Sequence, residues 1–299
     1  MSLCVEAPTY TILHFQEADC EEPLGSKEKA WVSQGRTQWL FKYPRASGEH
    51  WAEKIACEVA RRLGLPHAEV ELATLQDERG VASKDILAKG ESLIHGNELL
   101  AAQLPVYDIH KKWRQRQHTL ANIWEAIELR VYFCEEAKSI FLGYLLLDAL
   151  VGNSDRHHEN WGFVRGPNCR YRLAQTYDHG SSLGRELTDH SRKQNCRQKI
   201  LQLGTMEKYV CRARGSVFWV EGEEKAPTPV GLIVHAARDR RYCDYLEPWL
   251  DVIGRDFLED ILHEVDRVPE GWMSELARDF VKEMLSCTVK MLGGMLGRW

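Results

Sequence analysis

The sequence has no closely spaced cysteine pairs. Its nine cysteines are scattered singly along 299 residues, none forms a Cys-x-x-Cys pair, and their number is odd. This pattern argues against a disulfide framework and against a zinc site built from close ligand pairs. We therefore expect reduced thiols that pack mostly as small apolar side chains.

The sequence also lacks a segment suited to crossing a membrane. Its most apolar run, Ile140 to Val151, is too short to span a bilayer and contains Asp148. The N-terminus shows no basic stretch followed by an apolar one, as a secretory signal would. We expect a soluble, cytoplasmic protein without a membrane partner.

An excess of positive charge is absent as well. The formal net charge is -5 at pH 7, in a chain that is 44% hydrophobic and 28% charged. This composition is typical of soluble globular proteins and argues against direct nucleic-acid binding. One basic stretch, His110 to Arg116, departs from it. It is either a solvated helix face or a surface that recruits an acidic substrate.

The chain contains neither a Walker pattern nor a run of closely repeated glycines. The sequence divides into two parts that differ in their secondary-structure pattern. Residues 9–87 read as mostly β-structure with one helix, and residues 97–299 read as mostly α-helix. We predict an α+β fold with a small β-rich N-terminal part and a larger helical C-terminal part.

Local patterns locate the elements of the first part. Apolar residues repeat every four positions from 48 to 65, which predicts a helix that ends at Gly64. Short runs rich in aliphatic and aromatic residues predict four strands, at Lys29 to Ser33, Thr37 to Tyr43, Ala68 to Leu75 and Gly80 to Leu87.

In the second part, helical patterns cover Leu120 to Arg130 and Ala137 to Leu150. The latter segment is apolar on almost every side, so we expect it to be the central buried helix. Near the C-terminus, an apolar stripe from Met273 to Met291 keeps helical spacing. Such a stripe is far more often core than a binding surface, and we assign it to the core.

The segment after the apolar run carries the candidate chemistry. Asp155 and Asn160 are five residues apart, and Asp178 follows in Thr-Tyr-Asp-His-Gly. Kinase catalytic loops space a catalytic Asp and a metal-binding Asn in this way. Amide and carboxylate oxygens suit Mg²⁺, which keeps much of its water. His157 lies inside this loop, and we expect it to pack beneath the loop because Asp155 already fills the role of base.

A lysine and a small turn add candidates for a nucleotide site. Lys42 stands among apolar residues of a predicted strand, where its ammonium needs a carboxylate or a phosphate. Glu53 and Glu58 of the following helix are both candidate partners. The turn Gly25-Ser26-Lys27 would let backbone amides approach phosphate oxygens, although by itself the segment is better explained as a plain solvated turn. The order of these motifs along the chain is that of a protein kinase fold.

With these residues in view, the chain resembles the HipA-like serine/threonine kinase family. The specific part is Asn153-Ser-Asp-Arg-His-His-Glu-Asn160 followed by Tyr177-Asp178. Other similar stretches are Leu24 to Lys27, Trp51 to Leu65, Leu93 to Leu100 and Ser181 to Arg185. Asp-Arg-His stands where typical eukaryotic kinases have His-Arg-Asp, which is normal for this family, and Asp-His-Gly replaces their Asp-Phe-Gly.

The resemblance implies a bilobal protein kinase-like fold, with residues 1–90 as the N-lobe and 91–299 as the C-lobe. ATP and Mg²⁺ are the implied cofactors. Asp155 would orient and deprotonate the acceptor hydroxyl, and Asn160 and Asp178 would ligate Mg²⁺. Lys42 would contact the nucleotide phosphates, with Glu53 as its partner.

Further roles follow from the same resemblance. Gly25, Ser26 and Lys27 would cover the phosphates, and Ser26 is a candidate for autophosphorylation because family members modify a serine in that loop. A protein substrate and an antitoxin-type regulator are the implied partners. HipA toxins usually carry an additional N-terminal subdomain, which we do not expect in this chain.

Several functions stay open from the sequence alone. The leading one is an ATP- and Mg²⁺-dependent kinase that phosphorylates Ser or Thr of a protein. A lipid or small-molecule kinase of the same fold would use the same catalytic loop. A nucleotide-binding pseudokinase that acts as an interaction module is the third. Retention of Lys42, Asp155, Asn160 and Asp178 argues against it, because pseudokinases usually lose such residues.

Overall fold

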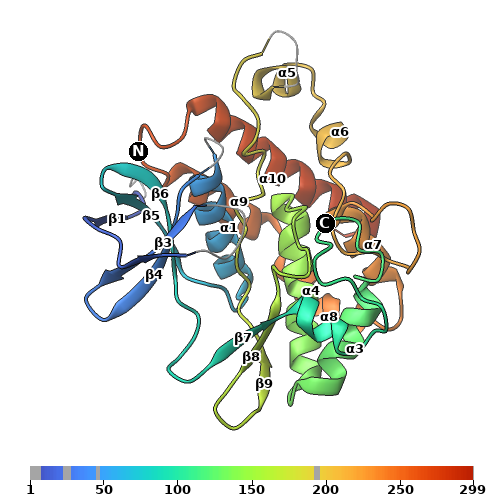
Figure 1. Ribbon diagram of the computed structural model, residues 1–299. Helices are drawn as coiled ribbons and strands as arrows, with labels where there is room; N and C mark the ends of the chain where they lie inside the picture. Colours follow the sequence, from blue (N-terminus) through green and yellow to red (C-terminus); the bar gives the residue numbers. More distant parts are fainter. Residues whose placement is uncertain (1–7, 23–27, 45–47, 192–195, 299) are drawn as a thin grey trace.

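A computed structural model describes residues 8–22, 28–44, 48–191 and 196–298 of the chain. Figure 1 shows a β-rich part built from the first third of the chain beside a larger helical part. The α+β, two-lobed architecture predicted from the sequence is confirmed. The turn Gly25-Ser26-Lys27 lies outside the described residues.

The β-rich part is a six-stranded sheet in the order β1-β5-β6-β4-β3-β2. β1 runs parallel to β5, and the other neighbours are antiparallel. Gly35, at a φ of +63°, makes the two-residue turn that joins β3 to β4. The strands are β1 (Ile12–Phe15), β2 (Cys20–Glu21), β3 (Lys29–Gln34), β4 (Thr37–Lys42), β5 (Val70–Leu75) and β6 (Glu78–Lys84).

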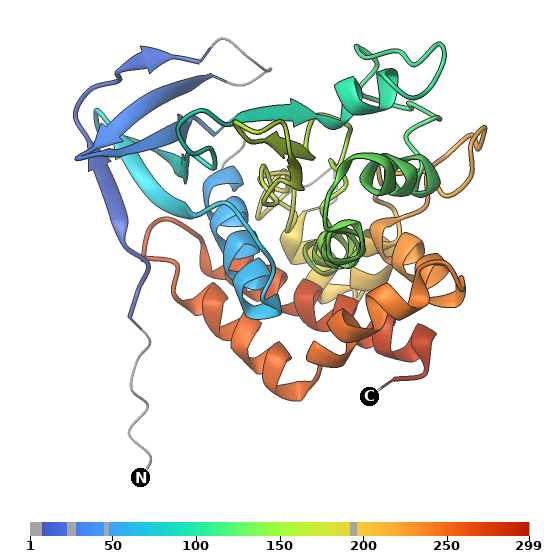
Figure 2. The same cartoon turned by 90° about the horizontal axis from the view of Figure 1, so that it is seen from below.

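Helix α1 (Glu49–Leu63) packs between this sheet and the helical part. It contacts β5 and β6 on one side and α4 and α9 on the other, and Figure 2 shows it next to the sheet. Thirteen of its 15 residues are buried. It ends where predicted, because Gly64 adopts a φ of +75° and caps the last carbonyls.

A second, three-stranded sheet was not predicted in the part expected to be mostly helical. It consists of β7 (Ser92–His95), β8 (Gly162–Arg165) and β9 (Tyr171–Leu173). β7 pairs with β8 across nearly 70 residues of intervening chain, for example at Ile94 and Phe163. This pairing fixes the two ends of the segment that carries Asp155 and Asn160.

The helical part is organised around α4 (Cys134–Val151), which contacts α1, α3, α7, α8 and α10. Thirteen residues of α4 are buried, as its apolar sequence predicted. It ends at Gly152, whose φ is +65°, and the candidate catalytic loop begins there. The other helices are α2 (Gly96–Ala101), α3 (Leu120–Arg130), α5 (Arg197–Gln202), α6 (Met206–Val210), α7 (Pro229–Arg238), α8 (Cys243–Val252), α9 (Arg255–Asp266) and α10 (Glu275–Leu296).

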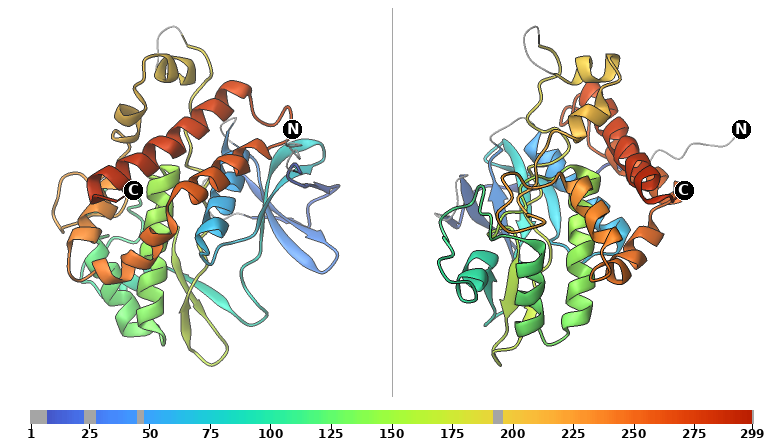
Figure 3. Two further views of the ribbon diagram at one scale, coloured as in Figure 1. Left: turned by 180° about the vertical axis from the view of Figure 1, so that it is seen from behind. Right: turned by 90° about the vertical axis from the view of Figure 1, so that its right-hand side faces the viewer.

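The long C-terminal helix α10 confirms the apolar stripe as core. Phe280, Val281 and Leu285 are fully buried, and the helix contacts α4, α7 and α9. Ser274 caps its first turn by accepting a hydrogen bond from the Ala277 amide. Figure 3 shows α9 and α10 side by side across the back of the molecule. Among the described residues, no helix has the length and apolarity required to traverse a bilayer.

Candidate active site

A cavity of about 330 Å³ lies between the six-stranded sheet and the loop that follows α4. Its walls come from β3, β4, β6, β7, the segment 85–87 and the segments 155–160 and 177–178. Four of the residues singled out from the sequence line it, namely Lys42, Asp155, Asn160 and Asp178. Glu22 and Lys29 also line it, on either side of the turn that the structure does not describe.

Lys42, the last residue of β4, joins the two lobes through its ammonium group. Nζ lies 2.6 Å from Glu53 Oε1 of α1 and 3.1 Å from Asp178 Oδ1. Burial would lower the pKa of Lys42, but the two carboxylates outweigh it, so the pKa lies above its ordinary value. The lysine is therefore a fixed positive charge on the wall of the cavity.

Only one of the two candidate glutamates meets Lys42. Glu58 lies further along α1 and accepts a hydrogen bond from Lys54 at 2.7 Å. The sequence could not distinguish Glu53 from Glu58, because both lie on the same helix within reach of the sheet. The structure assigns Glu53 to Lys42.

The loop after α4 is held by hydrogen bonds to its own backbone. Asn160 Nδ2 donates to the Asp155 carbonyl at 2.8 Å, which leaves the amide oxygen as the ligand-type atom of this side chain. The Asn153 side chain accepts from the Asp155 amide at 3.0 Å. Asp155 Oδ2 accepts a hydrogen bond from Ser181 at 3.1 Å. Asp155 and Asn160 therefore face the cavity from one rigid turn.

A buried ion pair that sequence reasoning missed supports this loop. Arg156 donates Nε and Nη2 to the two carboxylate oxygens of Asp148 at 2.8 and 2.7 Å. Its Nη1 donates to the Asn160 carbonyl at 2.8 Å, and Asn153 donates to the same aspartate. Arg156 is thus a positioning residue that ties α4 to the loop. The available signal was Asp148 itself, the single charge in the apolar run from Ile140 to Val151, which has to find a partner.

Asp178 reaches the cavity through an uncommon backbone conformation. Its φ is +59°, in the left-handed region that non-glycine residues seldom adopt and that concentrates at functional sites. Its neighbours hold it there. Tyr177 donates its hydroxyl to the Glu159 carbonyl at 2.8 Å, and His179 lies 3.0 Å from the Thr176 hydroxyl.

The histidines of the loop behave as packing groups. His158 Nδ1 lies 2.7 Å from the Tyr107 hydroxyl, and burial lowers the pKa of His158 to about 4. His157 packs edge-on against Trp113 and His158, and burial lowers its pKa as well. The His158 ring is therefore neutral at pH 7, and His157 Nε2 lies 3.6 Å from Asp155 Oδ1.

Comparison with known proteins decides the family. A profile of the HipA-like C-terminal domain matches residues 23–215, well over half of the chain. The chain belongs to the HipA-like C-terminal domain family. It is accordingly a kinase-like protein, as the motifs predicted.

This HipA-like chain is similar to one named kinase in both sequence and structure. Over 157 residues it is 29% identical to the serine/threonine-protein kinase CtkA of Helicobacter pylori. That match covers 48% of this chain and 46% of CtkA, so the chain spans about half the length of its curated relative. The crystal structure of the Helicobacter pylori proinflammatory kinase CtkA has the same fold, with a TM-score of 0.79, 22% identity, and 97% and 98% of the two chains covered.

A more distant structure shares the architecture. It is the HipA chain of the Shewanella oneidensis toxin–antitoxin complex of HipA, HipB and operator DNA. The TM-score is 0.59 at 13% identity, and the alignment covers 94% of this chain and 67% of HipA. At these identities both structures show the fold alone.

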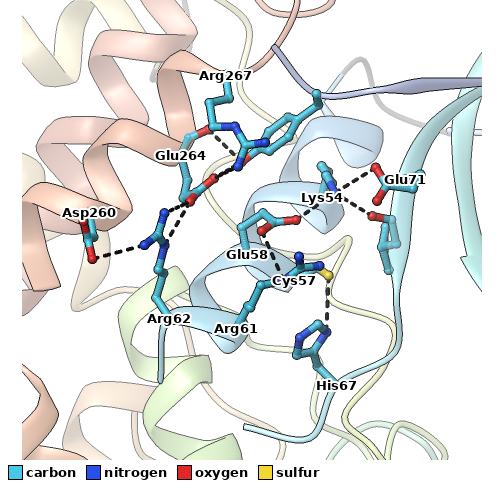
Figure 4. A network of polar contacts seen from close by, with 12 residues as sticks. Lys54, Cys57, Glu58, Arg61, Arg62, His67, Glu71, Asp260, Glu264 and Arg267 are labelled. Carbon is cyan, nitrogen blue, oxygen red and sulfur yellow. Dashed lines mark hydrogen bonds and ion pairs between the residues drawn. The ribbon is translucent and has the colours of Figure 1, made fainter. Parts of the chain in front are cut away.

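In this HipA-like chain, a polar network connects α1 to β5 and to α9 (Figure 4). Lys54 contacts Glu58, the Val70 carbonyl and Glu71, which binds the helix to β5. Arg62, at the other end of α1, donates Nε to Glu264 of α9 at 2.9 Å. The helix that carries Glu53 is therefore fixed to the sheet and to α9 at once.

Glu264 should make this anchor sensitive to acid. Burial raises its pKa, but hydrogen bonds from Arg62, Tyr10 and Arg267 outweigh this and hold the pKa below its ordinary value of 4.5. A lowered carboxyl pKa stabilises the fold above that value, and the contribution is lost as the pH falls through the lower, folded-state pKa. We expect Glu264→Gln to lower the free energy of unfolding by about 2 kcal/mol at pH 7.

Urea unfolding at steps from pH 7 to pH 3 measures this effect. The difference between wild type and Glu264→Gln should shrink as the pH falls below 4.5. Glu259→Gln, an exposed change on the same helix, is the matched control. A stability difference that is constant across this range would contradict the prediction.

Proposed function

We propose that this protein is an ATP- and Mg²⁺-dependent serine/threonine kinase that phosphorylates a protein hydroxyl. The observation that carries the proposal is that Lys42, Asp155, Asn160 and Asp178 line one cavity, with Glu53 paired to Lys42. Phosphoryl transfer requires mainly positioning and charge neutralisation, so this small set of groups suffices.

The residues that line the cavity would suit a nucleotide, with one group of side chains for the base and another for the phosphates. Apolar side chains of β4, β7 and the 85–87 segment, among them Leu40, Leu87 and Leu93, suit a flat base. Lys42, which contacts Asp178, would bind phosphate oxygens. Residues 1–90 then form the half that holds the base and phosphates, with Gly25, Ser26 and Lys27 covering the latter, and residues 91–299 form the catalytic half.

Asn160 and Asp178 are the residues that would hold Mg²⁺. Their side-chain oxygens are hard ligands of the kind that Mg²⁺ prefers. The Asn160 amide nitrogen donates a hydrogen bond to the loop, which leaves the amide oxygen available for a metal ion. The ion, when bound, would neutralise phosphate charge. The oxygen of the acceptor hydroxyl would bond to the γ-phosphorus while the bond between that phosphorus and the ADP oxygen breaks. Asp155 would take the proton that the hydroxyl loses.

The experiment that tests the proposal is incubation of the protein with γ-labelled ATP, Mg²⁺ and a whole-cell lysate, read by phosphoproteomics. We expect new phosphoserine or phosphothreonine sites, and their loss when EDTA removes the metal. Labelled lipids or metabolites instead of proteins would support the alternative of a small-molecule or lipid kinase. Calorimetric binding of ATP without transfer to any acceptor would support the pseudokinase.

Two further proposals concern the setting of this activity. An antitoxin-type regulator is a proposed partner, since HipA of Shewanella oneidensis is found with HipB. We also propose a cytoplasmic location and no direct contact with nucleic acid or membranes, on the grounds of the composition.

Glu53→Gln separates the role of this glutamate from that of Glu58. Loss of the Glu53 carboxylate removes one of the two anchors of Lys42, and we expect kcat/KM for ATP to fall by about tenfold to a hundredfold. Glu58→Gln removes one of the two carboxylate partners of Lys54 instead, so it should lower stability and leave KM for ATP unchanged. Steady-state kinetics and urea unfolding of both variants measure this, and equal changes in KM would contradict the assignment.

A further inference from the structure

A second cavity, of about 440 Å³, lies on the other side of Asp155. It shares Lys112, Asp155 and His157 with the first cavity. The carboxylate that we propose as the base is therefore accessible from two directions. If the first cavity takes the nucleotide, the second is where an acceptor hydroxyl can reach the same carboxylate.

The hydroxyl of Ser181 occupies the position beside Asp155 where we expect an acceptor hydroxyl to bind. Ser181 lines the second cavity and donates to Asp155 Oδ2 at 3.1 Å. Arg185 donates Nη2 to the Ser181 oxygen at 3.2 Å and forms an ion pair with Glu49. An acceptor hydroxyl has to donate a hydrogen bond to Asp155, as the Ser181 hydroxyl does here. The second cavity therefore offers the geometry that an incoming hydroxyl requires.

Two loops, residues 102–119 and 211–228, contribute to the wall of this cavity. Each contains a basic stretch, 111–116 in the first and 212–214 in the second, and we call these two stretches the rim. Trp113 lines the cavity from the first loop and Ala213 from the second. The loops are joined, because Phe218 donates its amide to the His118 carbonyl at 2.9 Å. The rim contains six basic side chains, Lys111, Lys112, Arg114, Arg116, Arg212 and Arg214.

Most of this positive charge faces solvent. Lys112 forms an ion pair with Glu159, whereas within the described ranges no ion pair is recorded for the other five basic residues of the rim. The protein as a whole carries a net charge of -5, whereas the stretches 111–116 and 212–214 hold six basic and no acidic side chains. Of the acidic side chains in the cavity wall other than Asp155, Glu49 is paired with Arg185, and Glu186 accepts a hydrogen bond from Tyr209.

The same rim exposes apolar surface. Trp113 is 62% exposed and its ring stands 6.0 Å from that of His157. Val106, earlier in the first loop, is 96% exposed and has a φ of +67°, which is rare for a β-branched residue. Exposed aromatic side chains beside a cavity are typical of sites that contact another polypeptide.

We propose that the second cavity and its basic rim bind the acceptor as a protein segment in which acidic residues and an apolar side chain flank the phosphorylated Ser or Thr. The acidic residues would contact the rim arginines and the apolar side chain would pack on Trp113. This inference rests on the proposed kinase function and specifies its substrate class. Nucleic acid fits less well, because the overall charge repels its extended phosphate backbone.

The test compares two synthetic peptides with two variants. One peptide has a serine flanked by Glu and Leu, and its partner has Gln in place of every Glu. The rim variant carries Arg114→Gln, Arg116→Gln, Arg212→Gln and Arg214→Gln. The control variant removes the same charge at distant exposed positions, with Arg36→Gln, Arg240→Gln, Arg255→Gln and Lys290→Gln. Peptide binding is followed by fluorescence anisotropy, and transfer from labelled ATP by KM and kcat.

We expect the wild type and the control variant to prefer the acidic peptide, and the rim variant to raise its KM by about tenfold with kcat nearly unchanged. Added salt should weaken binding of the acidic peptide in the wild type but not in the rim variant. Equal affinity for the two peptides, equal behaviour of the two variants, or tighter binding of duplex DNA at the rim would overturn the inference.

The failure of this inference is distinguishable from the failure of the kinase proposal. If lysate proteins are phosphorylated but the two peptides behave alike, the acceptor preference is wrong and the kinase assignment stands. If ATP binds and no protein receives phosphate, the kinase assignment itself is wrong.

Discussion

Asp155→Asn should lower the rate of phosphoryl transfer by about a hundredfold to ten-thousandfold, the range that a general base contributes. The amide keeps the size of the carboxylate and can still accept the hydrogen bond from Ser181, so the loop geometry is retained. What is lost is the ability to take the proton of the acceptor hydroxyl. Lys42 and Asp178 are untouched, and ATP affinity should stay within about twofold of wild type.

Two measurements on the same preparation check this result. Initial rates with labelled ATP report transfer, and calorimetry reports nucleotide binding. Asp244→Asn, an exposed change on α8, is the matched control and should behave as wild type in both. Wild-type rates from Asp155→Asn would remove this residue from the mechanism, and lost ATP binding would mean that the substitution disturbs the cavity.

Asp148→Ala should have the largest effect on stability, lowering the free energy of unfolding by about 3–5 kcal/mol. The substitution leaves the Arg156 guanidinium buried without its carboxylate partner and removes the acceptor of the Asn153 amide. Urea unfolding measures the loss. Glu69→Ala breaks the exposed ion pair with Lys84 and should cost less than about 1 kcal/mol.

A double variant separates support of the loop from support of the fold. Asp148→Leu with Arg156→Met replaces the ion pair by apolar side chains and should recover much of the stability lost in Asp148→Ala. Phosphoryl transfer should stay impaired, because the Asn160 carbonyl has lost its donor. If the double variant is fully active, the ion pair serves stability alone.

Elements with strong local signals were predictable from the sequence. Helix α3 was predicted at Leu120 to Arg130, where it is found, because Thr119 caps its first turn and its apolar positions repeat at helical spacing. The hairpin of β3 and β4 depends on Gly35 in a two-residue turn, which is also a local property. Lys42, Asp155, Asn160 and Asp178 were found through their spacing and order.

Features that depend on distant contacts could not be predicted. The strands of the second sheet are only three or four residues long, so none gives a recognisable pattern before β7 and β8 meet. The choice of Glu53 over Glu58 depends on how α1 is rotated against the sheet. The bond between Arg156 and Asp148 depends on the loop folding back under α4. The second cavity exists only once residues 181–185 and both basic loops surround Asp155.

The packing of α1 has a consequence for inhibitor design. The helix is packed on both faces and held by Lys54 and Arg62, and Lys42 contacts Glu53 in this structure. We expect inhibitors that require an outward movement of this helix to bind poorly. Compounds that compete in the cavity of Lys42 and Asp178, or that block the basic rim, are the ones that this architecture admits.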